Sequence, residues 1–383
     1  MKDLALRHLR EELAELDQRG LLRQQGEPVD AASATAMLSL CSNDYLGYRS
    51  SRRLDRFARD AVARHPVGAG ASRLVAGDHR AHRALELALA GWLECDETLV
   101  FTSGYAANVG VLAALADEGD LIVSDALNHA SIIDGCRLSR ARTVVVPHNA
   151  TDRVREVLMQ STARRRWVVT ESYFSMDGDG PDLVALRGIC DEWDAALIVD
   201  EAHALGVMGP SGRGRAASMG VKPDVLVGTM GKALAGQGAF VAGSADLCRW
   251  LWNRARSFVF STGLSPFVAA VGVGAIAEAK SDDVGRERLV GWSNRLRDGL
   301  RARGIDVANR EGPILPIVVG GERSALDWSR ALAQEGVLVQ AIRPPTVPSG
   351  ASRLRLTVRA DLTEPEVERA LQAFGAAAQG RGT

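Results

Sequence analysis

Lys232 stands in a setting that invites a chemical explanation. It lies in the stretch GTMGKALAGQGAF (228–240), directly after the apolar run DVLV. Lysine is almost never fully buried unless it is paired, whereas a run of glycine and alanine lets the backbone approach another group closely. Lys232 is therefore either an ordinary surface charge on a glycine-rich loop or a reactive amine beside a bulky anionic group.

Other side chains with useful chemistry also follow apolar runs. Asp200 and His203 lie in DEAHALG, Gly104 and Tyr105 lie in FTSGYAAN, and Thr229 lies three residues before the lysine. An amine can form a Schiff base with an aldehyde, a carboxylate can keep a pyridine nitrogen protonated, and a helix N-terminus can bind a phosphate. Taken alone, Asp200 would be interpreted as a helix cap. Taken together, these residues predict a site for pyridoxal 5'-phosphate, with His203 near the phenolic oxygen of the ring.

Competing signatures are incomplete. The tetrapeptide DEAH also occurs in helicases, which need a phosphate-binding loop of the form GxxxxGK[ST]. Leu226 stands five residues before Gly231, and Ala233 follows the lysine, so that pattern fails at both ends. The stretch TSGYA lacks the first glycine of a hydrolase nucleophile elbow. His79 and His82 form a helical pair without an acidic third ligand, so we expect no metal site there.

The elements that must position these residues are short apolar runs alternating with helical stretches. The runs are almost unbroken Val, Ile and Leu, as expected for parallel strands covered on both faces. The candidate strands span 98–101, 121–124, 143–146, 167–170, 196–200, 224–228 and 239–243. This alternation predicts an α/β fold with a mostly parallel seven-stranded sheet and helices on both faces. Ligands bind beyond the carboxyl ends of such strands, where the residues above are found.

The pattern changes after about residue 285. The runs ILPIVVG, VLVQAI and RLRLTV, followed by a helix from TEPEVERAL, indicate a smaller α+β domain. The N-terminal stretch MKDLALRHLREELAELDQRG is a charged amphipathic helix rather than a signal peptide, which would need an apolar centre. We therefore predict an N-terminal helix and arm over 1–47, a large domain over 48–285 and a small C-terminal domain over 286–383.

Composition narrows the function further. The 383 residues carry a formal net charge of -1, so no global charge points to nucleic acid or to an anionic membrane. The five cysteines have neither zinc-finger nor redox spacing, and no apolar run reaches the ~18 residues of a membrane span. We expect a cytoplasmic protein with reduced thiols.

With these motifs in place, the chain resembles the α-oxoamine synthases, which are fold-type I pyridoxal-phosphate enzymes with an aminotransferase-like fold. The resemblance runs from LSLCSNDYLGY (38–48) to RLRLTVRADLTEPEVERAL (353–371). Members of this family join an amino acid to an acyl thioester with loss of carbon dioxide. The resemblance therefore implies a transferase that forms a carbon–carbon bond.

Three stretches are most similar to the branch of the family that uses alanine and a pimeloyl thioester. They are GAGASRLVAGDHRAHRALE (68–86), DEAHALGVMGPSGRG (200–214) and AIRPPTVPSG (341–350). The resemblance implies L-alanine with pimeloyl-CoA or pimeloyl-acyl carrier protein as substrates, and a role in biotin biosynthesis. The alternative is a sister enzyme that uses glycine or serine with another acyl-CoA. A carrier protein would need a basic surface, but the basic stretch 52–65 is more simply a solvated helix face.

The resemblance also assigns roles at the cofactor. Lys232 would carry the cofactor, Asp200 would pair with its ring nitrogen, and His129 would stack over the ring and contact substrate. Ser175 and His203 would reach the ring oxygen. The phosphate would be held by Gly104, Tyr105 and Thr229 and, from a neighbouring subunit, by Thr262, which implies an obligate homodimer.

At the substrate, Arg355 would clamp the amino-acid carboxylate. Arg23, Arg343 and Thr346 would be further substrate contacts, and Arg19 competes with Arg23 because the N-terminal segment aligns loosely.

Simpler interpretations of some of these residues stay open. His129 could cap a helix in NHASIID, and Ser175 could only shape the turn before MDGD. Arg355 could be solvated, with Arg353 on the same face of a strand because side chains alternate. Asn43 and Asp44, in SNDYLG, are interpreted as structural residues of a turn near the site.

Overall fold

The computed structural model describes residues 6, 8–23 and 37–379 of the chain. These residues divide into two compact units, Asn43–Leu289 and a second unit formed by Met1–Ser42 with Val290–Thr383. The first corresponds to the large domain predicted over 48–285. The N-terminal arm, which the sequence analysis treated separately, groups with the C-terminal segment. The cause is a parallel pairing of Leu38 with Val337 and of Ser39 with Leu338.

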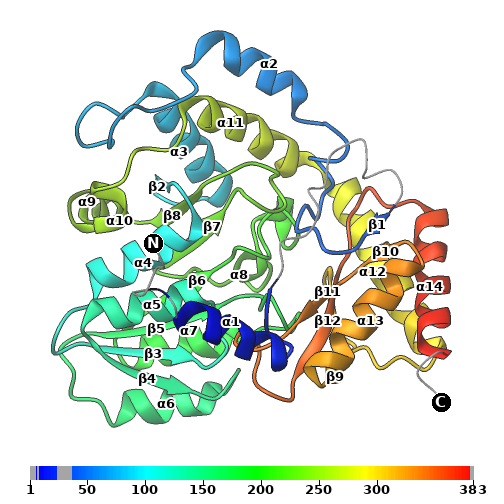
Figure 1. The fold of residues 1–383 in the computed structure, drawn as a ribbon. Coiled ribbons are helices and arrows are strands. Elements are labelled where there is room, and N and C mark those ends of the chain that lie inside the picture. The colour runs from blue at the N-terminus through cyan, green and yellow to red at the C-terminus, as the bar shows by residue number, and fades with distance from the viewer. Residues whose placement is uncertain (1–5, 7, 24–36, 380–383) are drawn as a thin grey trace. The chain divides into compact units, whose positions relative to one another are not determined.

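The larger unit is built on a seven-stranded sheet with the order β2-β8-β7-β6-β5-β3-β4 (Figure 1). Its strands are β2 (Glu97–Phe101), β3 (Leu121–Asp125), β4 (Arg142–Val146), β5 (Arg166–Glu171), β6 (Ala195–Asp200), β7 (Val225–Thr229) and β8 (Ala239–Gly243). Strand β8 runs antiparallel to both of its neighbours, and the remaining neighbouring pairs are parallel. The predicted mostly parallel sheet is confirmed, with each predicted strand present.

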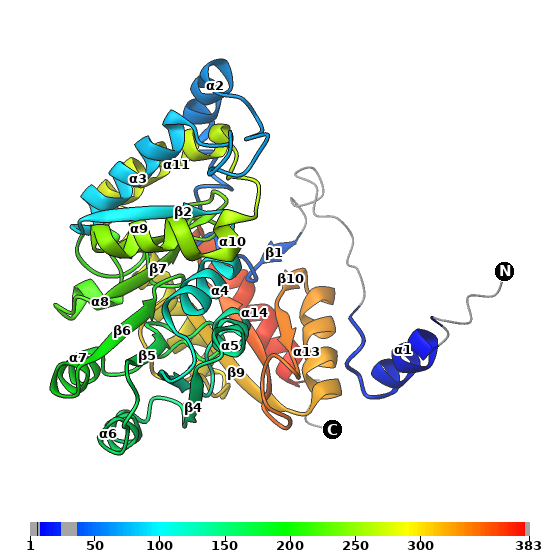
Figure 2. The same ribbon diagram turned by 90° about the vertical axis from the view of Figure 1, so that its left-hand side faces the viewer.

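Helices of the larger unit lie on both faces of this sheet and at its β2 edge (Figure 2). They are α2 (Asp55–Arg64), α3 (Arg80–Leu93), α4 (Gly104–Leu115), α5 (Ala130–Ser139), α6 (Thr151–Met159), α7 (Leu183–Glu192), the short helices η1 (Pro210–Gly212) and α8 (Arg215–Ser218), α9 (Ala245–Arg254), α10 (Arg256–Val259), α11 (Pro266–Ser281) and the start of α12 (Asp283–Ala302).

Alternation along the strands divides the core into two layers. Ile198 of β6 packs in the layer covered by α4, α5, α9 and α10. Its neighbours Leu197 and Val199 pack in the layer covered by α6, α7 and α8. A strand whose successive side chains enter two apolar layers must be apolar at every position, which explains the unbroken runs in the sequence. Burying one such Val, Leu or Ile side chain completely stabilises the fold by about 1.5–3 kcal/mol relative to leaving it exposed.

The smaller unit combines short sheets with helices. Its elements are α1 (His8–Gln18), β1 (Leu38–Ser39), β9 (Ile314–Gly320), α13 (Glu322–Gln334), β10 (Val337–Leu338), β11 (Gln340–Ile342), β12 (Ser352–Thr357) and α14 (Glu364–Gln379). Strands β11, β12 and β9 form an antiparallel sheet in that order. Helix α1 forms as predicted within its described residues, although residues 1–5 and 7 of the predicted helical stretch lie outside them.

One predicted strand of the smaller unit is divided in the structure. The run VLVQAI contains two strands, because β10 pairs with β1 whereas β11 pairs with β12. The break falls at Val339, whose carbonyl oxygen accepts a 2.6 Å hydrogen bond from the hydroxyl of Ser329. In the part of the chain that the structure describes, no helix is both long and apolar enough to cross a membrane.

Candidate active site

Parallel strands bring the predicted site residues to one edge of the sheet. Strand β6 ends at Asp200, and its neighbour β7 ends at Thr229, three residues before Lys232. Strand β5, on the other side of β6, ends at Glu171, which pairs in register with Asp200. The carboxyl ends of neighbouring strands therefore place a lysine and two carboxyl groups within one region of the larger unit, as doubly wound sheets do.

Lys232 belongs to a chain of hydrogen bonds. Its Nζ lies 2.7 Å from Nε2 of His203, and the hydroxyl of Tyr45 lies 2.7 Å from Nδ1 of the same ring. Tyr45 is fully buried, and its hydroxyl donates to Oδ1 of Asn43 at 3.2 Å. His203 is thereby fixed at both ring nitrogens, which orients its ring toward the amine of Lys232. Lys232 is partly buried and its amine contacts His203, which favours the reactive-amine interpretation over an ordinary surface charge.

Asp200 is a buried carboxylate with a donor at each oxygen. Oδ2 accepts a 2.7 Å hydrogen bond from Nδ2 of Asn108, and Oδ1 accepts a 2.8 Å bond from the backbone N–H of Ala202. The same Asn108 amide also donates to the hydroxyl of Ser131 at 3.0 Å. Helix α4 therefore holds the carboxylate in a fixed orientation through an amide on its buried face.

His129 caps helix α5, as its alternative interpretation predicted. Its Nδ1 accepts a 3.3 Å bond from the backbone N–H of Ser131 and lies 2.7 Å from the hydroxyl of that serine. Burial lowers the pKa of His129, the charge of Lys232 lowers it further, and Asp200 opposes both. Because Nδ1 accepts a hydrogen bond in a neutral ring, the proton is assigned to Nε2. The cap therefore leaves an N–H donor on the far side of the ring.

The predicted phosphate-binding segment is the start of α4. Ser103 caps this helix by accepting a 3.1 Å hydrogen bond from the backbone N–H of Ala106. A Cβ atom added to Gly104 would lie 4.0 Å from Cβ of Thr229, so the helix start adjoins the end of β7. The Thr229 hydroxyl donates to the carbonyl of Gly238 and accepts from the N–H of Gly231, both at 3.1 Å. This junction offers free helix N–H groups to an anion.

Two further predicted contacts lie beside this junction. Tyr105 is half-exposed, and its hydroxyl donates to the carboxylate of Asp134. Thr262 lines a crevice together with Thr102, the residue before the α4 cap. Its neighbour Gly263 donates a backbone hydrogen bond of 2.9 Å to the carbonyl of Ala71. Both residues lie in segments anchored to the larger unit.

Ser175 lies in a tight turn after β5. The N–H of Phe174 donates to the carbonyl of Asp179 at 2.7 Å, and the N–H of Gly178 donates back to Phe174 at 3.0 Å. His148 fixes this turn from outside, with Nε2 3.1 Å from Asp179 and Nδ1 3.0 Å from Asp125. Burial alone would lower the pKa of His148, but the two carboxylates outweigh it and raise this pKa to about 9. His148 is a charged clamp that holds the turn containing Ser175.

We expect His148→Gln to reduce the free energy of unfolding by about 1–3 kcal/mol at pH 6, because charge-assisted hydrogen bonds are lost. The pKa of histidine is near 6.5 in the unfolded chain and about 9 in the fold. The stabilisation is therefore complete below pH 6.5 and disappears as pH rises through about 9. Urea denaturation of both proteins at pH 6 and pH 10 checks this.

The control for that measurement is His8→Gln, which removes an exposed histidine of α1. Its effect should be small and independent of pH. A His148→Gln deficit of equal size at both pH values would show that the charge of His148 does not stabilise the turn.

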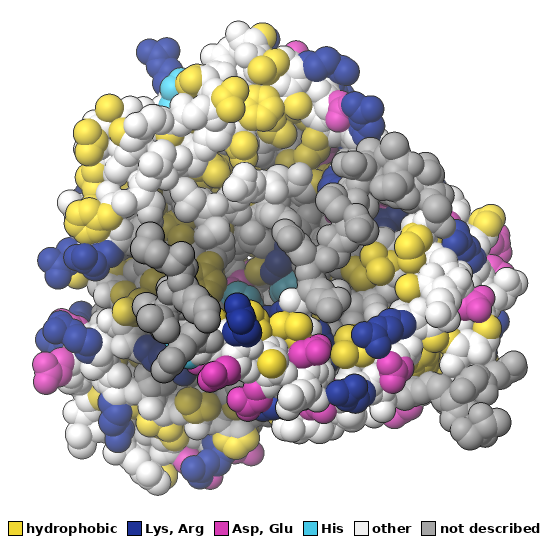
Figure 3. All heavy atoms as spheres, in the orientation of Figure 1, with side chains coloured by type: hydrophobic (Ala, Val, Ile, Leu, Met, Phe, Trp, Pro, Cys, Tyr) yellow, Lys and Arg dark blue, Asp and Glu magenta, His cyan; other side chains and the backbone are white. Residues whose placement is uncertain are grey.

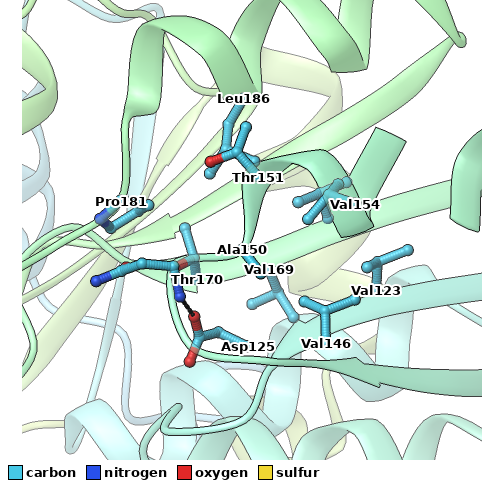
Figure 4. A pocket seen from close by; sticks show the side chains of 12 residues that line it. Val123, Asp125, Val146, Ala150, Thr151, Val154, Val169, Thr170, Pro181 and Leu186 are labelled. Atoms are coloured by element: carbon cyan, nitrogen blue, oxygen red, sulfur yellow. Dashed lines mark hydrogen bonds between the residues drawn. The ribbon is translucent and has the colours of Figure 1, made fainter. Parts of the chain in front are cut away.

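A pocket elsewhere in the larger unit is no rival site. It is lined by valines of β3, β4, β5 and α6 and by Leu186 of α7, with Asp125 at its border (Figure 4). The Asp125 carboxylate accepts hydrogen bonds from the N–H groups of Leu127 at 2.8 Å and of Asn149 at 2.7 Å, besides its contact with His148. The carboxylate of Asp125, the charged residue at the border of the pocket, is thus already hydrogen bonded within the protein. Among the described residues, no group of three or more His, Cys, Asp and Glu side chains could hold a metal ion.

In the smaller unit the predicted substrate residues form two groups. Nη2 of Arg23 donates a 3.1 Å hydrogen bond to the hydroxyl of Thr346, and Arg343 donates to the carbonyl of Gly20. Arg19 instead forms an exposed ion pair with Glu15 at 3.5 Å. The structure thus brings Arg23, and not its competitor, to the RPPT segment. Burial and the nearby charges of Arg23 and Arg330 lower the pKa of Arg343.

The second group lies on β12. Arg353 and Arg355 are 5% and 6% exposed, so the interpretation of Arg355 as a solvated side chain is wrong. Buried arginines are usually paired. The turn residue Asp44, by contrast, has the structural role expected of it, since its carboxylate accepts the backbone N–H groups of Tyr48 and Arg49.

Sequence reasoning missed three buried residues of the site. They are Tyr45, Asn108 and Glu171. A signal existed for Asn108, which is a lone amide in the apolar helix GYAANVGVLAAL. Tyr45 gave only a weak signal as an aromatic residue in a polar turn, and Glu171 resembled an ordinary acid at a strand end. Their contacts with the site depend on tertiary structure.

Comparisons with known proteins identify the family of this chain. Residues 35–374 match the family described as aminotransferase class I and II. The chain is 46% identical to an 8-amino-7-oxononanoate synthase of Anaeromyxobacter dehalogenans, over 95% of this chain and 94% of that protein. It is 45% identical to the enzyme of that name from Geobacter sulfurreducens, over 95% and 96% of the two chains.

A solved structure gives the same picture. A serine palmitoyltransferase from S. paucimobilis, described with bound PLP, is similar with a TM-score of 0.91 and 27% identity over 99% of both chains. The fold and the predicted family are confirmed. The chain belongs to the 8-amino-7-oxononanoate synthase family, within the class I and II aminotransferases.

Proposed function

We propose that this protein condenses L-alanine with a pimeloyl thioester, with loss of carbon dioxide, to give 8-amino-7-oxononanoate for biotin biosynthesis. The observation that carries the proposal is the 2.7 Å contact between Lys232 and His203, three residues after the buried carboxylate Asp200. The relatives named above are 8-amino-7-oxononanoate synthases, which supports this substrate pair.

The residues of the site fit pyridoxal 5'-phosphate. Lys232 offers an amine to the aldehyde, Asp200 offers an oriented carboxylate to the ring nitrogen, and the start of α4 with Thr229 offers donors to the phosphate. His203 and Ser175 are assigned to the ring oxygen. When bound, this cofactor supplies an electron sink for the carbanion at Cα of the amino acid.

The chain's own residues then divide the work. With the cofactor bound, Asp200 would keep the ring nitrogen protonated, because Asn108 and Ala202 fix the carboxylate oxygens in one orientation. The amine of Lys232 removes the proton from Cα of alanine and later returns a proton, as a positioned general base does. His203 hydrogen bonds to this amine and limits where it can point.

His129 is assigned to the acyl-transfer step. Its Nε2–H is free to donate, because Nδ1 is occupied by Ser131. A neutral N–H donor can stabilise the negative charge that develops on the thioester carbonyl oxygen without first losing its own proton. Covering one side of the ring, His129 would leave the other side to Lys232.

The substrate carboxylates are assigned to the arginines of the smaller unit. Arg355 would bind the carboxylate of alanine through a bidentate pair. Arg23, Arg343 and Thr346 would be further substrate contacts, and the cationic cluster suits the distal carboxylate of the pimeloyl chain.

We expect Arg355→Lys to weaken the affinity for alanine about 10–100-fold, because lysine cannot form the two parallel hydrogen bonds of a guanidinium fork. The affinity for pyridoxal phosphate should change less than about threefold. Absorbance titrations measure both affinities, with alanine added to the loaded protein and pyridoxal phosphate added to the cofactor-free protein. Arg353→Lys, on the same strand, is the matched control, and unchanged alanine affinity in Arg355→Lys would place the carboxylate clamp elsewhere.

We also propose a homodimer in which Thr262 reaches the phosphate of the neighbouring site. Exposed apolar side chains on two segments support this, Leu74 and Val75 on one and Phe260 on the other. The two segments are joined by the 2.7 Å hydrogen bond from the Ser72 hydroxyl to the carbonyl of Val259. Hydrophobic side chains also gather over the α2 end of the molecule (Figure 3). Exposed patches of this kind mark interfaces.

The function is tested by product formation. The protein reconstituted with pyridoxal phosphate is incubated with alanine, glycine or serine and with pimeloyl-CoA, acetyl-CoA or palmitoyl-CoA, and products are identified by mass spectrometry. We expect turnover with alanine and pimeloyl-CoA; pimeloyl-acyl carrier protein is tested in parallel. Turnover only with glycine or serine and another thioester would assign the protein to a sister activity.

The free cysteines support a reducing, cytoplasmic location.

A further inference from the structure

Glu171, the last residue of β5, is a buried carboxyl group without a role in the chemistry above. It is 3% exposed and stands at the edge of the sheet where the site lies. We propose that Glu171 is a positioning residue that enters the site as a neutral acid, with its proton held beside the ionised carboxylate of Asp200. The part that concerns the ring nitrogen rests on the proposed function, whereas the protonation state does not.

Register places the two carboxyl groups together. Glu171 of β5 and Asp200 of β6 are paired residues on neighbouring parallel strands. Paired positions of adjacent strands direct their side chains to the same face of a sheet. Two buried carboxyl groups that share a site do not both ionise readily, so one of them keeps its proton.

Hydrogen bonding decides which of the two is ionised. Both oxygens of Asp200 accept from N–H donors, one from Asn108 and one from Ala202, which favours the charged form. Oε1 of Glu171 has no hydrogen-bond partner among the described residues. The backbone N–H groups of His129 and Ser175 act on the pKa of Glu171 in the opposite sense to burial. Glu171 therefore has one oxygen, Oε1, on which a proton can remain.

The surrounding charges favour the neutral form. Burial raises the pKa of Glu171, the negative charge of Asp200 on β6 raises it further, and Lys232 after β7 lowers it, with a result of about 8. His129, before α5, also lies in this environment and is itself biased toward its neutral form. The geometry and the charges agree on a protonated acid at neutral pH.

A neutral Glu171 has two consequences. It leaves Asp200 as the single anion of the pair, so the ring nitrogen would meet one negative charge. Its carboxyl group is also influenced by the main chain of His129 and of Ser175, two residues assigned to the cofactor ring. Ionisation of Glu171 would add a second buried negative charge beside Asp200. It would also change the interaction of this carboxyl group with the main chain of His129 and Ser175.

The test compares Glu171→Gln with the wild-type full chain, without added cofactor, by urea denaturation from pH 5 to pH 10. Glutamine keeps the shape and the neutrality of a protonated glutamate. A folded-state pKa of about 8, above the unfolded value of 4.5, means that the folded wild type keeps a proton that the unfolded chain releases. As pH rises between these values, the folding equilibrium constant of the wild type should fall relative to that of Glu171→Gln by up to about tenfold per pH unit. The difference should level off above pH 8.

Glu201→Gln is the matched control. Glu201 is equally buried, but its oxygens accept from the Ser172 hydroxyl at 2.7 Å and from the N–H groups of Arg215 and Ala216 at 3.0 and 2.7 Å. Burial also raises the pKa of Glu201, but an amide NH₂ at this position must face a donor, so Glu201→Gln should be less stable than the wild type. If Glu171→Gln is tolerated and Glu201→Gln is not, the tolerance at position 171 is explained by a protonated glutamate there and not by burial alone.

A second measurement follows the absorbance of bound pyridoxal phosphate against pH. We expect Glu171→Gln to bind the cofactor and to lack an alkaline transition near pH 8 that the wild type shows. A constant stability difference across the pH range, or a Glu171→Gln chain that does not fold, would overturn the proposal. Failure of the wild type to bind the cofactor would instead count against the proposed function, since the denaturation result is independent of it.

Discussion

We expect Lys232→Ala to abolish the yellow absorption of the reconstituted protein and to lower turnover at least about 1,000-fold. The variant loses the amine that attaches the cofactor and the general base that acts on alanine, and general-base catalysis alone contributes about 10²–10⁴-fold. Absorbance spectra and kcat/KM measured with alanine and pimeloyl-CoA check this expectation. The fold should persist, because an alanine fits among the small residues that follow position 232.

Lys222→Ala is the control for this prediction, since Lys222 is an exposed lysine that precedes β7. Its spectrum and turnover should match those of the wild type. A Lys232→Ala protein that kept the absorption band and normal turnover would show that another amine holds the cofactor, and the site described above would be wrong.

We expect Asp200→Asn to lower kcat/KM at least about 100-fold while the protein still binds pyridoxal phosphate. Removal of a nearby negative charge shifts the pKa of a cationic partner by 1–3 units, so the ring nitrogen loses its proton at lower pH and the electron sink weakens. The substitution also turns an amide NH₂ toward the donors Asn108 or Ala202. Turnover and the pH dependence of the bound-cofactor spectrum are the measurements.

Asp182→Asn controls for the loss of one carboxylate. Asp182 caps α7 by accepting from the N–H of Ala185 at 3.0 Å, and asparagine caps a helix about as well. Its kinetics should be those of the wild type. Asp200→Asn with unchanged kcat/KM would mean that the ring nitrogen works without this carboxylate, and the proposed mechanism would fail.

The central sheet was predictable because its strands carry their own signal. Strands such as β6 enter two apolar layers and must be apolar at each position, so they stand out from the charged helices between them. The site residues Lys232 and Asp200 were predictable for a related reason. Parallel strands collect the residues that follow them at one edge, so position along the chain indicates position in space.

Long-range partners were not predictable from the same patterns. Tyr45 and His203 are 158 positions apart, and nothing in their local sequences indicates a hydrogen bond. The run VLVQAI has the composition of one strand, but it is divided because its first part pairs with β1 and its last part pairs with β12, in two different sheets. The protonation expected of Glu171 depends on its neighbour across the sheet, which the chain order does not reveal.

Because β1 pairs with β10, the two units can complete their folding at different times during translation. The larger unit is one continuous stretch of chain and is complete once Leu289 has left the ribosome. Leu38 emerges early but must wait for Val337, roughly 300 residues later, or about 15–60 s at ribosomal speeds. Protease digestion of stalled nascent chains should therefore reveal a resistant core of 43–289 while residues 1–42 are still cleaved.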